Sequence, residues 1–193
     1  MIERPVSRQP IPENAQRVFE GVIFDVFQWD VEAYDGSTLR FEKVRRDDTV
    51  VVIPSLSDKR IIIEEEEQPG RIPILTFPAG RMDVEGEDPL IAIKRELLEE
   101  TGYESDEWTL WRAFQPVTKV DWAVYIFTAR NCRKTREADP GPGERVNVLL
   151  KTLDEVMELV NEPNFISDDT RSDFLIAKYE PEARALLEKT LFG

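Results

Sequence analysis

The stretch at residues 88–102 constrains the fold of this chain more than any other. Asp88 is a residue type that caps helix N-termini, and Pro89 suits the first helical position. Gly102 supplies the left-handed backbone with which many helices end. Apolar residues recur between these ends at the spacing of one helical face, at Leu90, Ile93 and Leu97. The sequence therefore predicts an amphipathic helix with a defined start and a defined end.

The predicted helix carries three carboxylates, Glu96, Glu99 and Glu100, within about one turn. They share one face, where each like-charged pair costs on the order of a few tenths of a kcal/mol. A hard divalent cation removes this repulsion, because Mg²⁺ takes oxygen ligands and leaves positions for water and substrate phosphates. Ala92, one turn before Glu96, is small and is expected to keep the acidic face open.

A glutamate-rich helical face is more often just a solvated face, which is the ordinary alternative. Two neighbouring features favour a metal site instead. The helix has defined ends, and the bend at Pro78-Ala79-Gly80 is suited to presenting a backbone carbonyl. We therefore interpret the cluster as a metal site.

Composition narrows the chemistry further. The chain of 193 residues is long enough for one sizeable domain with a small appendage. Its net charge of −14 argues against binding a nucleic-acid backbone, although metal ions can still mask the charge of a bound pyrophosphate. The chain has no histidine, so acid–base roles must fall to carboxylates, lysine, tyrosine or water. Cys132 is the only cysteine, which excludes an intramolecular disulfide and a thiolate zinc site.

The sequence gives no indication of a membrane partner. No hydrophobic run approaches membrane-spanning length, and the first ten residues, MIERPVSRQP, do not resemble a signal peptide. We expect a cytoplasmic protein.

Strand-like and helix-like segments follow one another along the chain. Residues 1–15 are polar and proline-rich, and we expect a loosely held tail there. The turn signal Asp35-Gly36 predicts a hairpin between strands at 17–31 and 39–44. Further strands are expected at 49–54, 60–64, 108–114, 122–129 and 146–150, the last being the final strand. Helices are expected at 153–161, 169–179 and 182–191. The mixture predicts an α/β sandwich.

At the helix residues the chain resembles the Nudix hydrolase family, whose signature is Gly-x5-Glu-x7-Arg-Glu-(aliphatic)-x-Glu-Glu-x-Gly-(aliphatic). Glu87 and residues 95–102 match without a gap, whereas six residues rather than five separate Gly80 from Glu87. Arg95 is expected to pair with Glu87. The resemblance implies a Nudix-type α/β/α sandwich with a mixed sheet at residues 49–193. A small N-terminal antiparallel β subdomain at 1–48 would precede it.

The resemblance also implies a cofactor and catalytic residues. Mg²⁺ (or Mn²⁺) would be held by Glu96, Glu99, Glu100 and the carbonyl of Ala79, and Arg95 would support this catalytic helix.

A loop glutamate before the last strand would orient or deprotonate the attacking water in relatives that split ADP-ribose. Glu144 occupies that place, with Glu137 and Asp139 as rivals. Without the resemblance this loop would be an ordinary surface turn.

Within the family, the N-terminal hairpin and Pro116 resemble the ADP-ribose pyrophosphatase branch. There the hairpin supports a homodimer and helps to enclose the base, which implies substrate contacts for Phe41, Glu42 and Arg46. Phe41 can equally be a core strand residue. Relatives often carry Gln-aromatic-Arg before the loop and a glutamate at the bend, where this chain has Glu66-Glu67-Gln68-Pro69 and Thr76. Gln68 and Arg71 are the remaining substrate-binding candidates, Arg71 as a substitute for the displaced arginine.

The predicted activity is Mg²⁺-dependent hydrolysis of the pyrophosphate bond of a nucleoside diphosphate linked to another moiety, with ADP-ribose as the expected substrate. ADP-ribose would give AMP and ribose 5-phosphate. Another sugar nucleotide, such as GDP-mannose or a UDP-sugar, stays open as substrate, and so does a non-catalytic nucleotide sensor. An isopentenyl diphosphate isomerase-like activity is disfavoured, because that chemistry uses a histidine-containing metal site and this chain has no histidine.

Overall fold

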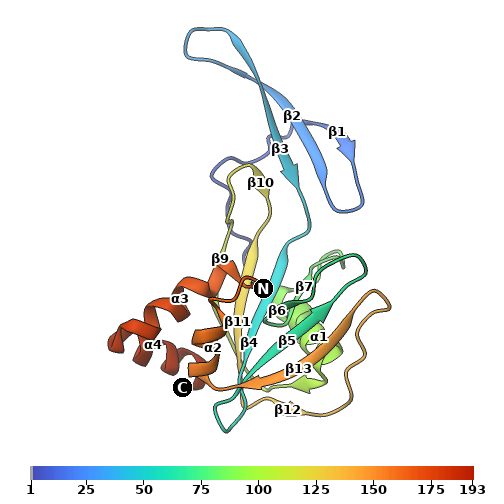
Figure 1. The fold of residues 1–193 in the computed structure, drawn as a ribbon. Coiled ribbons are helices and arrows are strands. Elements are labelled where there is room, and N and C mark those ends of the chain that lie inside the picture. The colour runs from blue at the N-terminus through green and yellow to red at the C-terminus, as the bar shows by residue number, and fades with distance from the viewer. Residues whose placement is uncertain (1) are drawn as a thin grey trace.

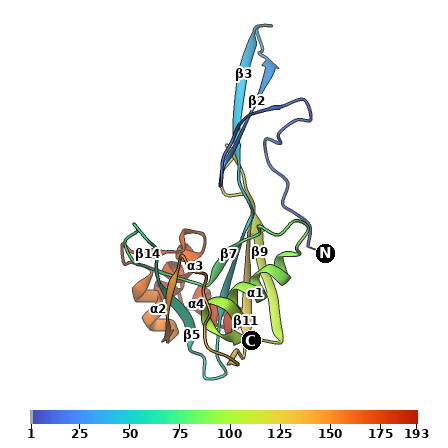
Figure 2. The same cartoon turned by 90° about the vertical axis from the view of Figure 1, so that its right-hand side faces the viewer.

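The computed structural model describes residues 2–193, apart from the side chain of Asp168. A compact body carries a β-arm that projects far from it (Figure 1). Figure 2 shows the same arm edge-on, standing away from the helices. Within the described residues, no helix is long and apolar enough to cross a membrane.

The arm is a small antiparallel sheet. It consists of β1 (Gln16–Glu20), β2 (Asp25–Glu32) and β3 (Thr38–Arg45), with the short β10 (Val120–Asp121) added parallel to β3. The expected hairpin is present, with Trp29 opposite Phe41 and Gly36 at φ 82° in its turn. The single strand expected at 17–31 was wrong. It is two strands, because Gly21 N donates to Phe24 O at 3.0 Å and closes a tight turn between them.

The body contains two larger sheets. One has the order β7 (Ala79–Arg81), β4 (Thr49–Pro54), β11 (Val124–Arg130) and β9 (Glu107–Phe114). The other has the order β13 (Arg145–Lys151), β5 (Ile61–Glu67), β6 (Ile74–Thr76) and β14 (Phe165–Ile166). Parallel and antiparallel pairs both occur, so the sheets are mixed, as expected. A two-stranded ribbon joins β8 (Tyr103–Glu104) to β12 (Arg133–Lys134).

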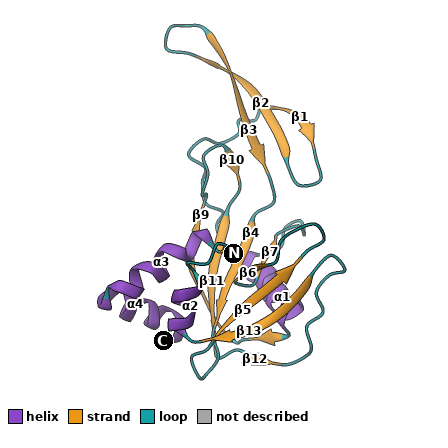
Figure 3. Ribbon diagram, in the orientation of Figure 1, coloured by secondary structure: helices purple, strands orange, loops and turns teal. Residues whose placement is uncertain are grey.

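Helices cover both faces of these sheets (Figure 3). Helix α1 (Pro89–Thr101) lies on one face, and α2 (Leu153–Leu159), α3 (Asp168–Tyr179) and α4 (Pro181–Phe192) lie on the other. The two-residue period of the strands explains this arrangement. On β5, Ile62 packs in the α1 core, whereas Ile61 and Ile63 pack in the core under α2–α4. The chain is therefore an α/β/α sandwich with an N-terminal β-arm.

Several short strands escaped the sequence prediction. β6, β7, β8, β12 and β14 have only two or three residues each, too few to show a hydrophobic period. The strand at 145–151 is thus not the final one, because β14 follows it. The expected strand at 122–129 begins at Val124, and helix α2 ends at Leu159 rather than at residue 161.

The N-terminal segment is not a loosely held tail, contrary to expectation. Its polar side chains and carbonyls have specific partners on the body and on the arm. Gln115 Nε2 donates to Pro5 O at 3.0 Å. Lys43 is buried, and its Nζ donates to Ser7 Oγ at 2.6 Å and to Gln9 O at 2.7 Å. Proline-rich composition predicted the lack of regular structure here but not these long-range contacts.

Candidate active site

Helix α1 begins and ends as the sequence predicts. The side chain of Asp88 accepts a hydrogen bond from Leu90 N at 3.0 Å, and Pro89 follows at the first helical position. Gly102 ends the helix at φ 75°, and its N–H donates to Leu98 O at 3.0 Å. The helix is therefore fixed at both ends before any ligand binds.

The extra residue between Gly80 and Glu87 is absorbed in the loop before the helix. Glu87 N donates to Val84 O at 3.1 Å, and Gly86 takes the left-handed backbone at φ 77°. Glu87 still reaches Arg95, with its Oε2 3.2 Å from Arg95 Nη2. The expected Arg95–Glu87 pair is confirmed, and the insertion leaves the helix residues in place.

The three helix glutamates do not point the same way. Glu96 and Glu100 are largely buried beneath the sheet edge, whereas the Glu99 side chain is 42% exposed and lies 3.4 Å from Arg95 Nη1. Ala92 does not keep an acidic face open. It is fully buried in the apolar core under α1, which corrects that expectation.

A close backbone approach holds Glu96 against strand β7. A Cβ atom on Gly80 would overlap the carboxyl group of Glu96, so a larger residue at this position would push the Glu96 side chain from where it lies. The carbonyl of Ala79 belongs to the same short strand, which pairs with β4 through Val51. Glu96 and the Ala79 backbone therefore line one side of the same cavity.

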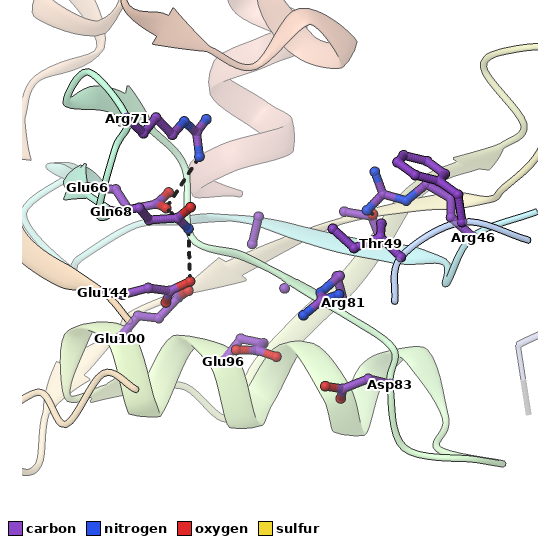
Figure 4. Close-up of a pocket in the computed structure, with 14 residues that line it drawn as sticks. Arg46, Thr49, Glu66, Gln68, Arg71, Arg81, Asp83, Glu96, Glu100 and Glu144 are labelled. Atoms are coloured by element: carbon purple, nitrogen blue, oxygen red, sulfur yellow. Dashed lines mark hydrogen bonds and ion pairs between the residues drawn. The ribbon is translucent and has the colours of Figure 1, made fainter. Parts of the chain in front are cut away.

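That cavity has a volume of about 580 Å³ and lies between α1, the ends of β5 and β7, and the arm (Figure 4). It brings together seven of the residues that the sequence predicted: Arg46, Gln68, Arg71, Ala79, Glu96, Glu100 and Glu144. Four predicted residues do not line it: Phe41, Glu42, Arg95 and Glu99. Arg95 and Glu99 lie on α1 outside the cavity lining, and their side chains form an ion pair with each other.

Two buried carboxyl groups interact beside the cavity: Glu100 lines it, and Glu64 lies next to Glu100. Burial, reinforced by the neighbouring Glu66 and Glu144 carboxylates, raises the pKa of Glu64 to about 8. Burial and the Glu64 carboxylate raise the pKa of Glu100 well above its ordinary value. One oxygen of each, Glu64 Oε1 and Glu100 Oε2, has no hydrogen-bond partner. Such buried oxygens are costly unless a cation or a proton meets them.

This donor set fits a hard divalent cation. Carboxylate and carbonyl oxygens are the ligands that Mg²⁺ prefers, and the site offers Glu96, Glu100 and Ala79 O beside the unpartnered oxygens. Within residues 2–193, no three acidic side chains already form a finished metal cage. Glu99 is half exposed, so its side chain has room to turn toward the other carboxylates if it leaves Arg95.

Of the three loop carboxylates considered, Glu144 lies in the cavity. Its Oε1 accepts a hydrogen bond from Gln68 Nε2 at 3.0 Å. Glu137 is 90% exposed and pairs with Lys134 at 2.8 Å, and Asp139 is exposed outside the lining. Glu144 is thus the one of the three that lines the cavity, and its role in catalysis stays a prediction.

The arginines of the cavity differ in their surroundings. Arg71 Nη1 lies 3.6 Å from Glu66 Oε1 at one end of the cavity. Arg46 lies at the other end over the ring of Trp122, with its Cζ 4.8 Å from the ring centroid. Burial and then the neighbouring Arg81 lower the pKa of Arg46.

Sequence reasoning missed Glu64, Glu66, Arg81 and the turn residues Ile23 and Phe24. A signal for the two glutamates was present. In a strand, residues two apart share a face, so Glu64 and Glu66 follow Ile62 toward α1. Arg81 and the arm turn carried no such signal, because their place in the cavity depends on long-range packing.

Phe41 and Glu42 lie on the arm, away from the cavity of their own chain. The Phe41 ring packs 6.2 Å from that of Trp29, and Glu42 Oε2 accepts from Gln28 Nε2 at 2.7 Å. Their role in substrate binding stays a prediction, and it requires a second subunit.

Comparison with known proteins agrees with this architecture. The family model of the NUDIX domain matches residues 45–169. A methanol dehydrogenase activator of Bacillus methanolicus is 31% identical over 161 residues, which are 81% of this chain and 86% of the relative. An ADP-ribose pyrophosphatase of Bacillus subtilis (strain 168) is 31% identical over 150 residues, 75% of this chain and 80% of the relative. A crystal structure of an ADP compounds hydrolase has a TM-score of 0.70 at 21% identity, covers 95% of this chain and 97% of that chain, and shows the same fold.

The chain belongs to the Nudix family, and the resemblance seen in its sequence is confirmed. Its residues match the family signature from Glu87 through Gly102, and the comparisons agree with this match, so it is a Nudix hydrolase.

Proposed function

We propose that this protein hydrolyses the pyrophosphate bond of a nucleoside diphosphate linked to another moiety, with ADP-ribose as the preferred substrate. The products would be AMP and ribose 5-phosphate. One observation carries the proposal: arginines and buried carboxyl groups face one cavity, and Glu100 Oε2 among them has no hydrogen-bond partner. A metal-bound diphosphate would bring a cation to the carboxylates and anionic oxygens to the arginines. The name of the Bacillus subtilis relative supports the choice of ADP-ribose.

The proposed metal ligands are Glu96, Glu100 and the carbonyl of Ala79, with Glu99 as a further ligand once it leaves Arg95. Bound Mg²⁺ or Mn²⁺ would offset the charge of the diphosphate and lower the pKa of the attacking water. Arg95 contacts both Glu87 and Glu96, at 3.2 Å and 2.9 Å. It therefore holds the ligand-bearing face of α1 against the preceding loop.

Glu144 is proposed to orient the attacking water or to accept its proton. The hydrogen bond from Gln68 holds one of its oxygens at the cavity wall and leaves the other for water. The loop before it contains Pro140, Gly141, Pro142 and Gly143, and we propose that this loop closes over the bound diphosphate.

The base would lie toward the arm. Ile23 and Phe24, in the β1–β2 turn, line the cavity at that end and offer apolar surface. We propose a homodimer through residues 17–46, in which the partner brings a second aromatic face, Phe41, together with Glu42. Large apolar side chains stay exposed on the arm of the single chain, which supports this proposal: Val18, Phe19, Val22, Ile23, Phe24 and Leu39.

One observation favours a different sugar nucleotide. Thr76 stands where relatives carry a ribose-contacting glutamate, and it is buried with its hydroxyl donating to Ile166 O at 2.9 Å. It is therefore not available to a ribose. GDP-mannose or a UDP-sugar is the second candidate substrate.

A substrate panel tests the proposal. ADP-ribose, GDP-mannose, UDP-glucose, dinucleoside polyphosphates and NADH are incubated with the full chain, with Mg²⁺ and with EDTA, and the products are separated by chromatography. We expect the highest kcat/KM for ADP-ribose, with AMP formed only when metal is present. A higher value for another sugar nucleotide would select the second candidate. Nucleotide binding without turnover of any compound would instead support the alternative of a non-catalytic nucleotide sensor.

A further inference from the structure

The charges around the cavity are unevenly paired. At the β5 end, Arg71 and Gln68 both contact Glu66, at 3.6 Å and 2.5 Å. Arg71 therefore neutralises a carboxylate of its own chain. Arg81 differs, since no carboxylate in the described part of the chain forms an ion pair with it although it lines the same cavity.

Strand pairing fixes where Arg81 lies. β7 runs antiparallel to β4 with Arg81 directly opposite Thr49, so the two side chains share one face. Thr49 Oγ1 accepts a hydrogen bond from Trp122 Nε1 at 2.9 Å. The Arg46 guanidinium group stacks over the Trp122 ring. Figure 4 accordingly shows Arg81 with Thr49 and Arg46, and Arg71 at the opposite end with Glu66 and Gln68.

The same strand ties Arg81 to the metal side of the site. Arg81 directly follows Gly80, which packs on Glu96, and comes two residues after the Ala79 carbonyl. Two like-charged guanidinium groups thus face one cavity beside the proposed metal ligands. Repulsion between them is relieved when an anion binds between them.

We propose that Arg81 is the phosphate-binding arginine of this site, with Arg46 as the second cation, and that Arg71 does not fill this role. The proposal rests on the proposed function, because it places the diphosphate of that substrate between the carboxylates of α1 and the strand β7. A guanidinium group offers two parallel N–H donors to phosphate oxygens, which a lysine cannot reproduce. The phosphate-binding arginine of this chain would then lie on β7 rather than in the loop after β5.

Steady-state kinetics of four variants test the assignment. Arg81→Met should lower kcat/KM for the best substrate by about thirtyfold or more, since a charge-assisted contact is lost. Arg81→Lys should recover part of that loss. Arg71→Met tests the rival assignment. The fold-loss in kcat/KM that it causes should be at least ten times smaller than the fold-loss caused by Arg81→Met. Arg133→Met, a control on the exposed β12, should match the wild type.

Binding of α,β-methylene-ADP in the presence of Mg²⁺, measured by calorimetry, separates this proposal from the proposed function. If the wild type binds this probe without hydrolysing any tested compound, and Arg81→Met loses the affinity, the Arg81 assignment stands while the enzyme function fails. An Arg81→Met variant with wild-type affinity and turnover would overturn the assignment. A larger loss of affinity or turnover in Arg71→Met than in Arg81→Met would also overturn the assignment. A wild type that binds no diphosphate would overturn both.

Discussion

The Arg4 guanidinium makes a two-pronged ion pair with the Asp48 carboxylate, Nε lying 2.7 Å from Oδ2 and Nη2 2.9 Å from Oδ1. Asp48 also accepts from Ala123 N through Oδ1 at 2.7 Å, and its carbonyl accepts from Met82 N at 2.9 Å. A single residue thus connects the N-terminal segment, the start of β11 and the strand that carries Arg81.

Removal of this ion pair should destabilise the fold measurably. Arg4→Met leaves the largely buried Asp48 carboxylate with fewer donors, and because Arg4 itself is 43% exposed we expect a loss of about 1–2 kcal/mol. Urea unfolding followed by tryptophan fluorescence measures the change. Arg133→Met provides the comparison, since its ion pairs lie on the exposed surface. Equal unfolding midpoints for the two variants would contradict the expectation.

Glu100 should be indispensable for turnover. Glu100→Gln removes a buried carboxylate of the proposed metal site, and kcat should fall by about a hundredfold or more at saturating Mg²⁺. The metal-free variant should be at least as stable as the wild type, because repulsion from Glu64 is relieved. Kinetics and thermal unfolding in EDTA provide the two measurements. Near-normal turnover would remove Glu100 from the metal site.

The buried carboxylates predict a pH dependence of stability. Because burial raises the pKa of Glu64 to about 8, the folded state keeps a proton that the unfolded chain releases at a lower pH. Stability then falls as pH rises between these two pKa values. The metal-free protein should therefore have a lower Tm at about pH 8 than at about pH 5. Added Mg²⁺ should restore Tm at the higher pH, and Glu64→Gln should flatten the metal-free profile. A profile that rises across this range would be incompatible with the buried pair.

Glu144 should act in the transition state rather than in binding. Glu144→Gln is expected to lower kcat strongly while KM for the nucleotide stays nearly constant. Glu137→Gln serves as the matched control, because that carboxylate is exposed and paired with Lys134. If the control variant is the impaired one, the loop keeps its role but the residue changes. If neither is impaired, water must be activated on α1 itself.

The arm predicts the oligomeric state. Large apolar side chains are exposed on β1, in the β1–β2 turn and on β3, and a second copy of the chain would cover them. Light scattering should report a dimer, and Phe19→Asp together with Val18→Asp should give monomers. An active monomer of the wild type at assay concentrations would count against the dimer and against a base contact from the partner's arm.

Local signals carried much of the prediction from sequence. The ends of α1, the Arg95–Glu87 pair and the hairpin turn at Gly36 each depend on neighbouring residues, and each is confirmed. Ala92 was misjudged because spacing shows which residues share a face but not what that face contacts. Packing against the sheet buries it.

Long-range pairing accounts for what the sequence could not show. Arg81 lies in the cavity because β7 pairs with β4 in one register, and β7 is too short to be recognised by its pattern. Glu64 and Glu66 were recognisable from strand alternation alone, yet their burial beside Glu100 required knowledge of which sheet face α1 covers. The division of the chain at residue 48 stays a prediction.

The pairing of β10 with β3 bears on how this protein could be trimmed. β10 lies between β9 and β11 in the sequence, yet its partner strand belongs to the arm. A fragment beginning at Thr49 would leave the edge of β10 without hydrogen-bond partners and would also lose the Asp48 contacts to Ala123 and Met82. Such a fragment should aggregate rather than fold into a small hydrolase. We therefore expect the smallest autonomous unit of this enzyme to include its arm.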